Sequence, residues 1–428
     1  MKTRYIYAIA LLLISFTMQA QIDRSKQPKP GPAPKININK PKTFELTNGL
    51  KVMVVENHKL PRFSASLTID NPPQAKGDKK GIEALTASLL GNGSKSISKD
   101  AFNEEVDFLG ANMNFGDESA FVSGLSKYFP RLIELMADAA LHPNFTQEEF
   151  DKEKAKLIEG LKSDENSVPA AARRVRDLLG YGAKHPYGEY TSEQSVNNIT
   201  LKDIQNHYTE FFAPNNAYLV IVGDITFDKA KELVTKYFIN WKRGLPPNLS
   251  FLKPRNVQYK QISFVDMPNA VQSELSVVST VDFEMTDPDY HAVLIANKIL
   301  GGGFNSMLNL NLREEHGYTY GARSSLGYRK YVPSMFIAST SIRNEVTAEA
   351  VKETLKEMTN IRTKDVTEEQ IKNAKAKYVG DFVLALERAE TIARYALNSE
   401  RNNLPADFYE TYLEKINQVG KFYENRFT

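Results

Sequence analysis

The chain has 428 residues, a length that exceeds one ordinary hydrophobic core and predicts two or three domains. Hydrophobic residues make up 42% and charged residues 25%, which is typical of globular proteins and excludes a wholly disordered chain. The formal net charge is +2, and no stretch has the basic pattern of a nucleic-acid binder. Cysteine is absent, which excludes disulfides, a cysteine nucleophile and lipidation of a cysteine.

Residues 1–20 have the pattern of a secretory signal peptide. Lys2 and Arg4 precede the apolar run Ile6–Phe16, and Ala20 is the expected cleavage position. The run is too short for a membrane span, which requires about 20 residues. We therefore predict an exported chain without an integral membrane segment, periplasmic if the host is a Gram-negative bacterium. An N-terminal membrane anchor is the alternative.

Residues 21–42 form a linker rich in lysine and proline. This composition does not pack into a core and favours an extended chain. We interpret the linker as a spacer, with a partner-binding arm or a tether to an anionic surface as the alternative.

Residues 43–242 form the first predicted domain. Alternating apolar residues and the Asn48-Gly49 turn predict two strands within 43–56 and a third strand at 63–69. The elements predicted to follow are a helix at 81–90, a helix at 100–109, strands within 112–125, helices at 129–141, 146–163, 169–179 and 200–212, a buried strand at 217–224 and a helix at 228–237.

Residues 243–254 form a linker rich in proline and asparagine, and residues 255–428 form the second predicted domain. Its predicted elements are strands at 257–265 and 274–281, a helix at 287–300 capped by Asp287, a helix at 305–315, strands within 318–343, and helices at 347–362 and 367–398.

The second domain repeats the order of the first. The run Val196–Ile199, with the sequence VNNI, parallels Ile416–Val419, with the sequence INQV. Because the first half continues into a strand whereas the second stops at Thr428, we expect the second domain to be truncated at its C-terminal end and the chain to be a piece of a longer protein. The order of elements predicts an α+β fold of two homologous domains, each a mainly antiparallel sheet with helices packed on one face.

The histidines do not predict a zinc helix. The chain has six, and no two lie four residues apart on one helical face. A site assembled from distant histidines is the alternative. His185, within His-Pro-Tyr-Gly, is interpreted as part of a turn because proline and glycine interrupt regular structure.

The segment 81–94 carries a motif from which the metal ligands are missing. It resembles the active-site helix of the pitrilysin/insulinase family of zinc metallopeptidases, which reads G-x-x-H-x-x-E-H. Ala84, Ala87 and Ser88 stand on the His, Glu and His positions. In the family's second run, E-x-x-x-x-x-x-E-[IL], the final glutamate is the third ligand, and its position here is Gly160, with Glu159 one residue away.

The resemblance covers nearly the whole chain from Thr43 onward. Further matching segments, each weak alone and specific by their common order, are Asn48–Leu50, His185–Gly188, Val220–Asp224 and Leu312–Glu315. A catalytic zinc requires three protein ligands and a base for its bound water. The resemblance therefore implies no cofactor in this chain and a zinc ion in a homologous partner.

Arg313 and Tyr320 match a pair that, in active family members, faces the zinc across the cleft and holds the substrate peptide. A guanidinium offers several donors to peptide carbonyls, and a phenol can donate to a carbonyl oxygen as negative charge develops there. The alternative is that Arg313 pairs with Glu314 or Glu315 on the surface while Tyr320 packs in the sheet.

The resemblance implies a non-catalytic, substrate-holding subunit of an exported heterodimeric zinc metallopeptidase that degrades peptides, with a homologous chain supplying the metal. Two alternatives stay open. The chain could be a peptide-binding or structural scaffold subunit without a proteolytic role. It could also be a hydrolase that uses other residues, although no G-x-S-x-G nucleophile motif is present.

Overall fold

The computed structural model describes residues 41–245 and 247–420. The predicted signal peptide and nearly all of the linker at 21–42 lie outside these described residues. The described residues belong to one compact unit that begins at Asn37. Within the described ranges, no helix is both long enough and apolar enough to cross a membrane.

The first sheet has six strands in the order β1-β2-β6-β3-β5-β4. Only β2 and β6 run parallel, and every other neighbouring pair is antiparallel, as predicted for a mainly antiparallel sheet. The strands are β1 (Lys42–Glu45), β2 (Lys51–Glu56), β3 (Arg62–Ile69), β4 (Asn112–Gly116), β5 (Ser119–Leu125) and β6 (Ala217–Gly223).

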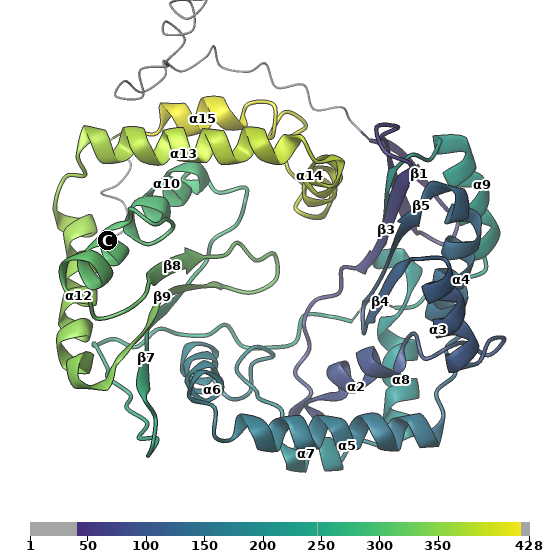
Figure 1. Ribbon diagram of the computed structural model, residues 1–428, viewed down its shortest axis with the longest axis horizontal. Coiled ribbons are helices and arrows are strands. Elements are labelled where there is room, and N and C mark those ends of the chain that lie inside the picture. The colour runs from purple at the N-terminus through teal and green to yellow at the C-terminus, as the bar shows by residue number, and fades with distance from the viewer. Residues whose placement is uncertain (1–40, 246, 421–428) are drawn as a thin grey trace, which may run out of the picture. The chain divides into compact units, whose positions relative to one another are not determined.

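Three helices cover one face of this sheet (Figure 1): α3 (Lys99–Phe108), α4 (Phe129–Leu141) and α9 (Phe227–Phe238). Their apolar faces form the main core with alternate residues of the strands, such as Leu67 of β3, Leu132 of α4 and Phe238 of α9. Each fully buried side chain of this size contributes about 1.5–3 kcal/mol, so this core is the chief stabilising feature of the first half.

A smaller core joins the helices that bear the degenerate motif. Leu85 and Leu89 of α2 (Ile82–Leu89) pack with Phe150 of α5 (Gln147–Asp164) and Ile204 of α8 (Leu201–Phe211). The remaining α-helices of the first half are α6 (Val168–Tyr181) and α7 (Glu193–Asn197).

The second sheet has three strands in the order β7-β9-β8. They are β7 (Gln272–Val281), β8 (Ala322–Leu326) and β9 (Ser334–Arg343). The helices of this half are α10 (Tyr290–Leu300), the short α11 (Met307–Asn309), the π-helix η5 (Leu310–Glu315), α12 (Thr347–Thr363), α13 (Glu368–Leu386), α14 (Ala389–Arg401) and α15 (Tyr412–Gln418).

A shared lysine contact supports the internal repeat. In the first half, Lys154 of α5 donates to the carbonyl oxygens of Asn197, at 3.0 Å, and Ile199, at 2.8 Å. In the second half, Lys375 of α13 donates to the carbonyl of Asn417, at 2.9 Å, and to that of Val419. Both lysines lie at the same spacing from a threonine N-cap, so the VNNI and INQV runs end in equivalent places.

The predicted strand at 257–265 is wrong, because the structure shows no strand there. In the first half the corresponding strand, β2, lies between β1 and β6 and takes its main-chain partners from them. The described part of the second half contains no counterpart of β6, so this apolar segment has no strand to pair with.

The long helical stretch predicted at 367–398 is helical but is interrupted once. The chain turns at Glu387 and Arg388 and divides into α13 and α14. The turn lets α14 pack on the second face of the first sheet, where Ala389 and Ala393 contact Met53 and Val220.

Two predicted helix starts in the second half also differ. Asp287 does not cap α10, because its carboxylate accepts from the main-chain N–H of Glu284 at 2.8 Å and Asp289 is the N-cap. The helix predicted at 305–315 is present from Met307 to Glu315, as the short α11 followed by the π-helix η5.

Asp70 joins the two halves through a buried carboxylate at the end of β3. Its side chain is 4% exposed and accepts from both Nε and Nη2 of Arg401, at 3.0 and 2.6 Å, and from Nζ of Lys330, at 2.8 Å. The Tyr331 hydroxyl also donates to it, at 3.2 Å. Burial alone would raise the pKa of Asp70, but the hydrogen bonds from Arg401 and Lys330 outweigh burial and hold it below its ordinary value.

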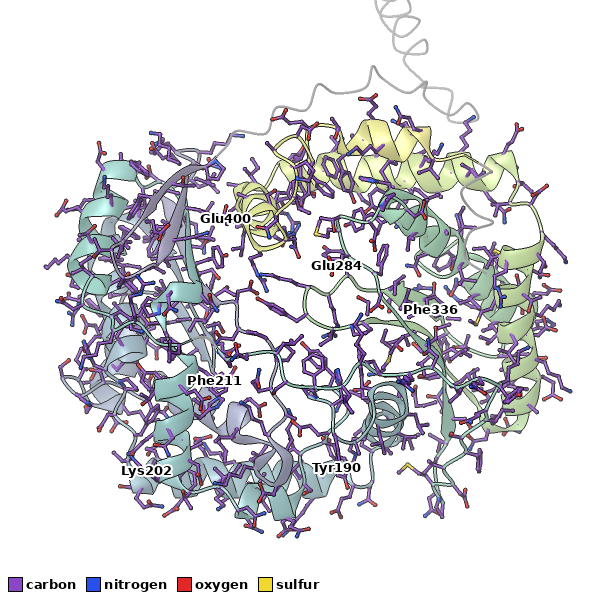
Figure 2. All side chains as sticks on the ribbon, turned by 180° about the vertical axis from the view of Figure 1, so that it is seen from behind. Tyr190, Lys202, Phe211, Glu284, Phe336 and Glu400 are labelled. Carbon is purple, nitrogen blue, oxygen red and sulfur yellow. The ribbon has the colours of Figure 1, made fainter. Side chains whose placement is uncertain are left out.

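We expect Asp70→Asn to destabilise the protein by about 3–5 kcal/mol at pH 7, because it leaves two partly buried cations without their counter-charge. The free energy of unfolding in urea is the measurement. The matched control is Glu400→Gln, at the residue labelled Glu400 in Figure 2. It breaks the more exposed ion pair with Lys51 and should cost no more than about 1 kcal/mol.

The contribution of Asp70 to the free energy of unfolding also depends on pH. Since its folded pKa lies below the ordinary value of 3.8, the stabilisation is complete above that value and is lost as pH falls through it toward the folded pKa. A difference between wild type and Asp70→Asn that is the same at pH 7 and pH 3 would contradict this role.

Candidate functional site

Helix α2 begins at a position that only glycine fits. Gly81 has φ +110, and a Cβ atom there would lie 2.7 Å from the Thr191 methyl group and 3.1 Å from a Val196 methyl group. A left-handed backbone and this close approach both favour glycine. Gly81 therefore sets where α2 enters its small core, and with it the direction of the motif positions.

The three motif positions on α2 hold no metal-binding side chain. Ala84, Ala87 and Ser88 follow the spacing that places residues on one helical face, where Ala84 is exposed and the other two are partly buried. The Ser88 hydroxyl donates to the carbonyl of Leu85 at 3.0 Å, and the Ser88 carbonyl accepts from the Asn92 amide at 2.9 Å. The one polar side chain of the three is thus bonded within its own helix.

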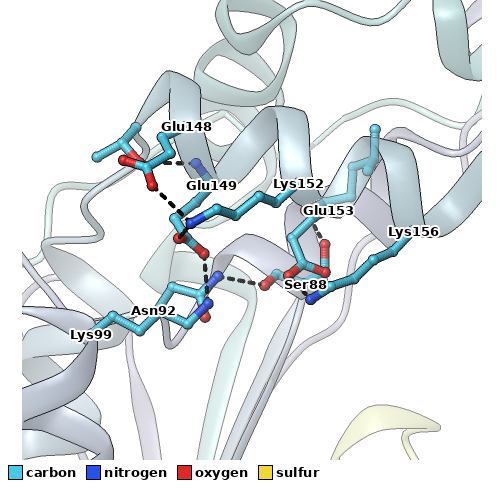
Figure 3. A network of polar contacts seen from close by, with 10 residues as sticks. Ser88, Asn92, Lys99, Glu148, Glu149, Lys152, Glu153 and Lys156 are labelled. Carbon is cyan, nitrogen blue, oxygen red and sulfur yellow. Dashed lines mark hydrogen bonds and ion pairs between the residues drawn. The ribbon is translucent and has the colours of Figure 1, made fainter.

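Helix α5 lies against α2, and several of its charged side chains are paired with one another or with Lys99 (Figure 3). Lys99 contacts Glu149 at 2.5 Å, and Lys156 contacts Glu153 at 2.7 Å. Gly160 is exposed, and nothing lies within 4 Å of the position that its Cβ would take. The space for a glutamate at Gly160 is therefore open, although the carboxylate itself is missing.

Across the described ranges 41–245 and 247–420, no group of three or more His, Cys, Asp and Glu side chains could hold a metal ion. His185 stacks on Tyr181 at 4.8 Å, and its main-chain N–H donates to Gly182 in a turn, as predicted for this segment. The residues at the motif positions do not fit a zinc ion, since two alanines, a serine and a glycine provide neither a ligand set nor a base.

Restoring zinc binding should require all four positions. We expect the chain with Ala84→His, Ala87→Glu, Ser88→His and Gly160→Glu to bind one zinc ion, and the chain with the first three changes alone to bind it much more weakly. Isothermal titration with zinc measures the difference. Adding Gly160→Gln to the triple variant is the matched control, because it keeps side-chain length and helix propensity without a carboxylate. Equal affinity of the triple and quadruple variants would place the third ligand elsewhere.

Arg313 and Tyr320 lie in a part of the second half that hydrogen bonds of buried asparagines hold in place. Asn311 in η5 donates to Glu353 and Glu357 of α12, at 2.8 and 2.9 Å. Asn309 donates to the Phe304 carbonyl at 2.7 Å and accepts from the main-chain N–H of Ala322, at the start of β8, at 3.3 Å. These buried amides hold η5 and the chain around Tyr320 in place.

The two side chains themselves are accessible. Tyr320 is 91% exposed, so the alternative that it packs in the sheet is wrong. The Arg313 guanidinium lies 4.6 Å from the centre of the Phe304 ring, and its Nε lies 3.4 Å from a Glu314 carboxylate oxygen. The predicted surface pairing with Glu314 is therefore present, and it leaves other guanidinium donors available to a ligand.

Sequence reasoning missed a polar cluster on the segment that leads into α2. Asn71 donates to the Glu118 carboxylate at 2.9 Å and to the carbonyl of Phe211, which is labelled in Figure 2, at 2.8 Å. The Lys76 ammonium lies 3.7 Å from the centre of the Phe211 ring. Burial raises the pKa of Glu118 to about 7 and lowers that of Lys76. No periodic pattern marks these residues, because they meet only through folding.

We expect Glu118→Gln to stabilise the protein at pH 8 by up to about 3 kcal/mol relative to wild type, at 1.36 kcal/mol per pKa unit. The folded pKa of about 7 lies above the ordinary value of 4.5, so the cost of ionisation is absent below 4.5 and complete above 7. Thermal unfolding at pH 4 and pH 8 checks this, with the exposed Glu210→Gln as control. A gain of equal size at both pH values would contradict it.

Comparison with known proteins shows that the chain is similar to M16 peptidases. Residues 198–378 match the family model described as peptidase M16 inactive domain. A non-peptidase homolog from Helicobacter pylori is 22% identical to this chain, and the alignment covers 88% of each protein. A zinc protease from the same organism is also 22% identical, and that alignment covers 74% of this chain and 72% of the protease. The solved peptidase M16 inactive domain from Pseudomonas fluorescens superposes with a TM-score of 0.78 at 22% identity, covering 90% of this chain and 93% of its own.

Proposed function

Because this chain belongs to the M16 family of peptidases, also called the insulinase family, and has no zinc ligand at the motif positions, we propose that it is the substrate-holding subunit of a heterodimeric zinc metallopeptidase. A homologous partner chain with an intact H-x-x-E-H helix supplies the metal and its bound water. One observation carries the proposal. The motif positions hold no metal ligand, whereas Arg313 and Tyr320 are accessible and lie in a segment that buried hydrogen bonds hold in place.

The contacts of Arg313 suit a peptide ligand. The Phe304 ring holds one face of the guanidinium, and this restriction lowers the entropy that Arg313 loses when it binds a carbonyl oxygen. The exposed Tyr320 phenol is free to donate to an oxygen that gains negative charge during peptide cleavage. The two residues therefore orient the substrate while the partner's metal site performs the hydrolysis.

Export to the periplasm belongs to the same proposal. The apolar run after Lys2 and Arg4 supports secretion, and the absence of cysteine leaves no thiol that an oxidising compartment could oxidise. A complex in that location would degrade short or unfolded peptides.

The test uses the chain reconstituted with its zinc-bearing partner. We expect Arg313→Ala and Tyr320→Phe to leave the heterodimer assembled and its zinc bound while lowering kcat for a peptide by about 10²–10³, as loss of a transition-state donor does. If the residues bind substrate and transition state equally, KM rises and kcat hardly changes. Steady-state kinetics with a fluorogenic peptide separates the two roles.

The matched controls are Arg362→Ala and Tyr190→Phe, which change an exposed arginine and an exposed tyrosine elsewhere on the chain. They should leave both constants unchanged. If the Arg313 and Tyr320 variants behave like these controls, substrate holding is excluded and a structural scaffold becomes the better account.

A further inference from the structure

The loop between β8 and β9 is fixed on both sides of one arginine that has no carboxylate partner. Before it, Tyr328 packs edge-on against Tyr290, with 5.6 Å between the ring centres. After it, Lys330 donates to Asp70 at 2.8 Å. Arg329 lies between them and is exposed, and no carboxylate of the described ranges is within ion-pair distance of it. Its neighbours, and not an ion pair of its own, therefore set its position.

The Arg329 guanidinium lies over the ring of Tyr187, 4.3 Å from the ring centre. Tyr187 belongs to the segment that joins α6 to α7 and is 37% exposed. A guanidinium placed over an aromatic face keeps N–H donors at its rim, and these donors match the two oxygens of a carboxylate. Because the ring already restricts the arginine side chain, the side chain loses less entropy when it binds a ligand.

A second donor lies beside Tyr187. The ring of His185 is 5.9 Å from that of Tyr187, and His185 is 3% exposed. The main-chain N–H of Tyr187 donates to His185 Nδ1 at 3.1 Å, so the neutral imidazole carries its proton on Nε2. This Nε2 atom is buried and has no hydrogen-bond partner in the part of the chain that the structure describes. An unpaired buried donor is costly, and a ligand oxygen can satisfy it.

The charges around these donors favour an anion. Burial, and to a smaller extent the charge of Arg329, lower the pKa of His185, so the imidazole is neutral at neutral pH. The carboxylate of Asp177 on α6 is bonded to Arg176, at 2.9 Å between Oδ1 and Nε. That pair is neutral as a whole and leaves the charge of Arg329 uncompensated.

We propose that Arg329, placed on Tyr187 and beside His185, binds a carboxylate group of a peptide. The guanidinium donates to both oxygens, and His185 Nε2 donates to one of them. The carboxylate is either the C-terminal one or that of an aspartate or glutamate side chain, since the two have the same chemistry. The inference rests on the proposed function only in taking the ligand to be a peptide.

Strand β8 connects this site to the proposed substrate-holding residues. Tyr320 precedes β8 and Arg329 follows it, so the two residues lie beyond opposite ends of one strand. The five residues of β8 span about 17 Å, and an extended peptide of the same length has about five residues. A peptide of about eight residues is therefore long enough to be held at Tyr320 and to place a carboxylate at Arg329.

The probe is an octapeptide of alanine, threonine and glycine with an uncharged fluorophore at its N-terminus, titrated with the full chain and followed by fluorescence anisotropy. It is made with a free C-terminal carboxylate, with a C-terminal amide, and as the amide with one internal aspartate or one internal asparagine. We expect a carboxylate to raise affinity about tenfold over its amide counterpart. The pair of peptides that shows the difference identifies the source of the carboxylate. No detectable binding, or equal affinity for all four peptides, would overturn the proposal.

Arg329→Gln tests the site in the protein. It should abolish the preference for a carboxylate and leave the affinity for the amidated peptide and the melting temperature unchanged, because the exposed side chain has no ion pair to lose. The matched control is Arg394→Gln, which changes another exposed arginine over a tyrosine ring, that of Tyr395 at 5.8 Å. The control should keep the preference. If both variants lower it equally, the preference reflects net charge and the site is refuted.

His185→Asn tests the second donor. Asparagine can still accept from the Tyr187 N–H but has no group at the place of Nε2, so the preference should fall about threefold. The melting temperature is measured as well, because His185 is buried. An unchanged preference in the folded variant would remove His185 from the site, and if the variant does not fold, Arg329→Gln decides the proposal.

The experiment can fail independently of the proposed function, because it uses the chain without a zinc-bearing partner. Arg313→Ala should lower affinity for all four peptides alike and keep the preference for a carboxylate. A preference that survives Arg329→Gln would overturn the carboxylate site and leave the substrate-holding role of Arg313 untouched. Turnover that is unaffected in the Arg313 and Tyr320 variants would do the opposite.

Discussion

The buried carboxylate of Asp70 is the interaction on which the joining of the two halves depends. It collects hydrogen bonds from Lys330 before β9 and Arg401 at the end of α14, and it is fixed at the end of β3. A buried charge is stable only when it is fully paired. The end of β3, the segment before β9 and the end of α14 must therefore lie next to one another. Because Arg401, the last residue of α14, binds Asp70, α14 lies across the second face of the first sheet. There Ala393 packs near Val220.

The degenerate site shows that a catalytic scaffold can persist after its chemistry is lost. Gly81 still sets the start of α2, and Leu85 and Phe150 still form the small core with α5 and α8. What differs from an active zinc helix is confined to exposed or partly exposed positions such as Ala84 and Gly160. Such positions contribute little to packing, so they can change without unfolding the helices around them.

The internal repeat explains why the second half has no strand at 257–265. Lys154 and Lys375 make equivalent contacts in the two halves, which indicates that the two halves have the same order of elements up to α15. Beyond that point the second half has no described counterpart of β6. Among the residues that the structure describes, the segment at 257–265 therefore has no strand to pair with.

Sequence by itself determined the α+β class, the order of nearly all elements and the loss of the zinc ligands. These properties are local: alternation in β3, threonine N-caps before α5 and α13, and the residue types at 84, 87, 88 and 160 are visible without knowing what each segment contacts. Arg313 and Tyr320 are predicted as candidates through the resemblance of the segment 312–320 to the insulinase family.

Only the tertiary structure decided what depends on partners distant in sequence. The apolar pattern at 257–265 is that of a strand, yet a strand forms only where another one offers its main-chain groups. The turn between α13 and α14 follows from the sheet that α14 covers, and the raised pKa of Glu118 follows from its burial, which the hydrogen bond from Asn71 only partly offsets. Pairing, burial and charge compensation are relations between segments, so no single segment of the sequence contains them.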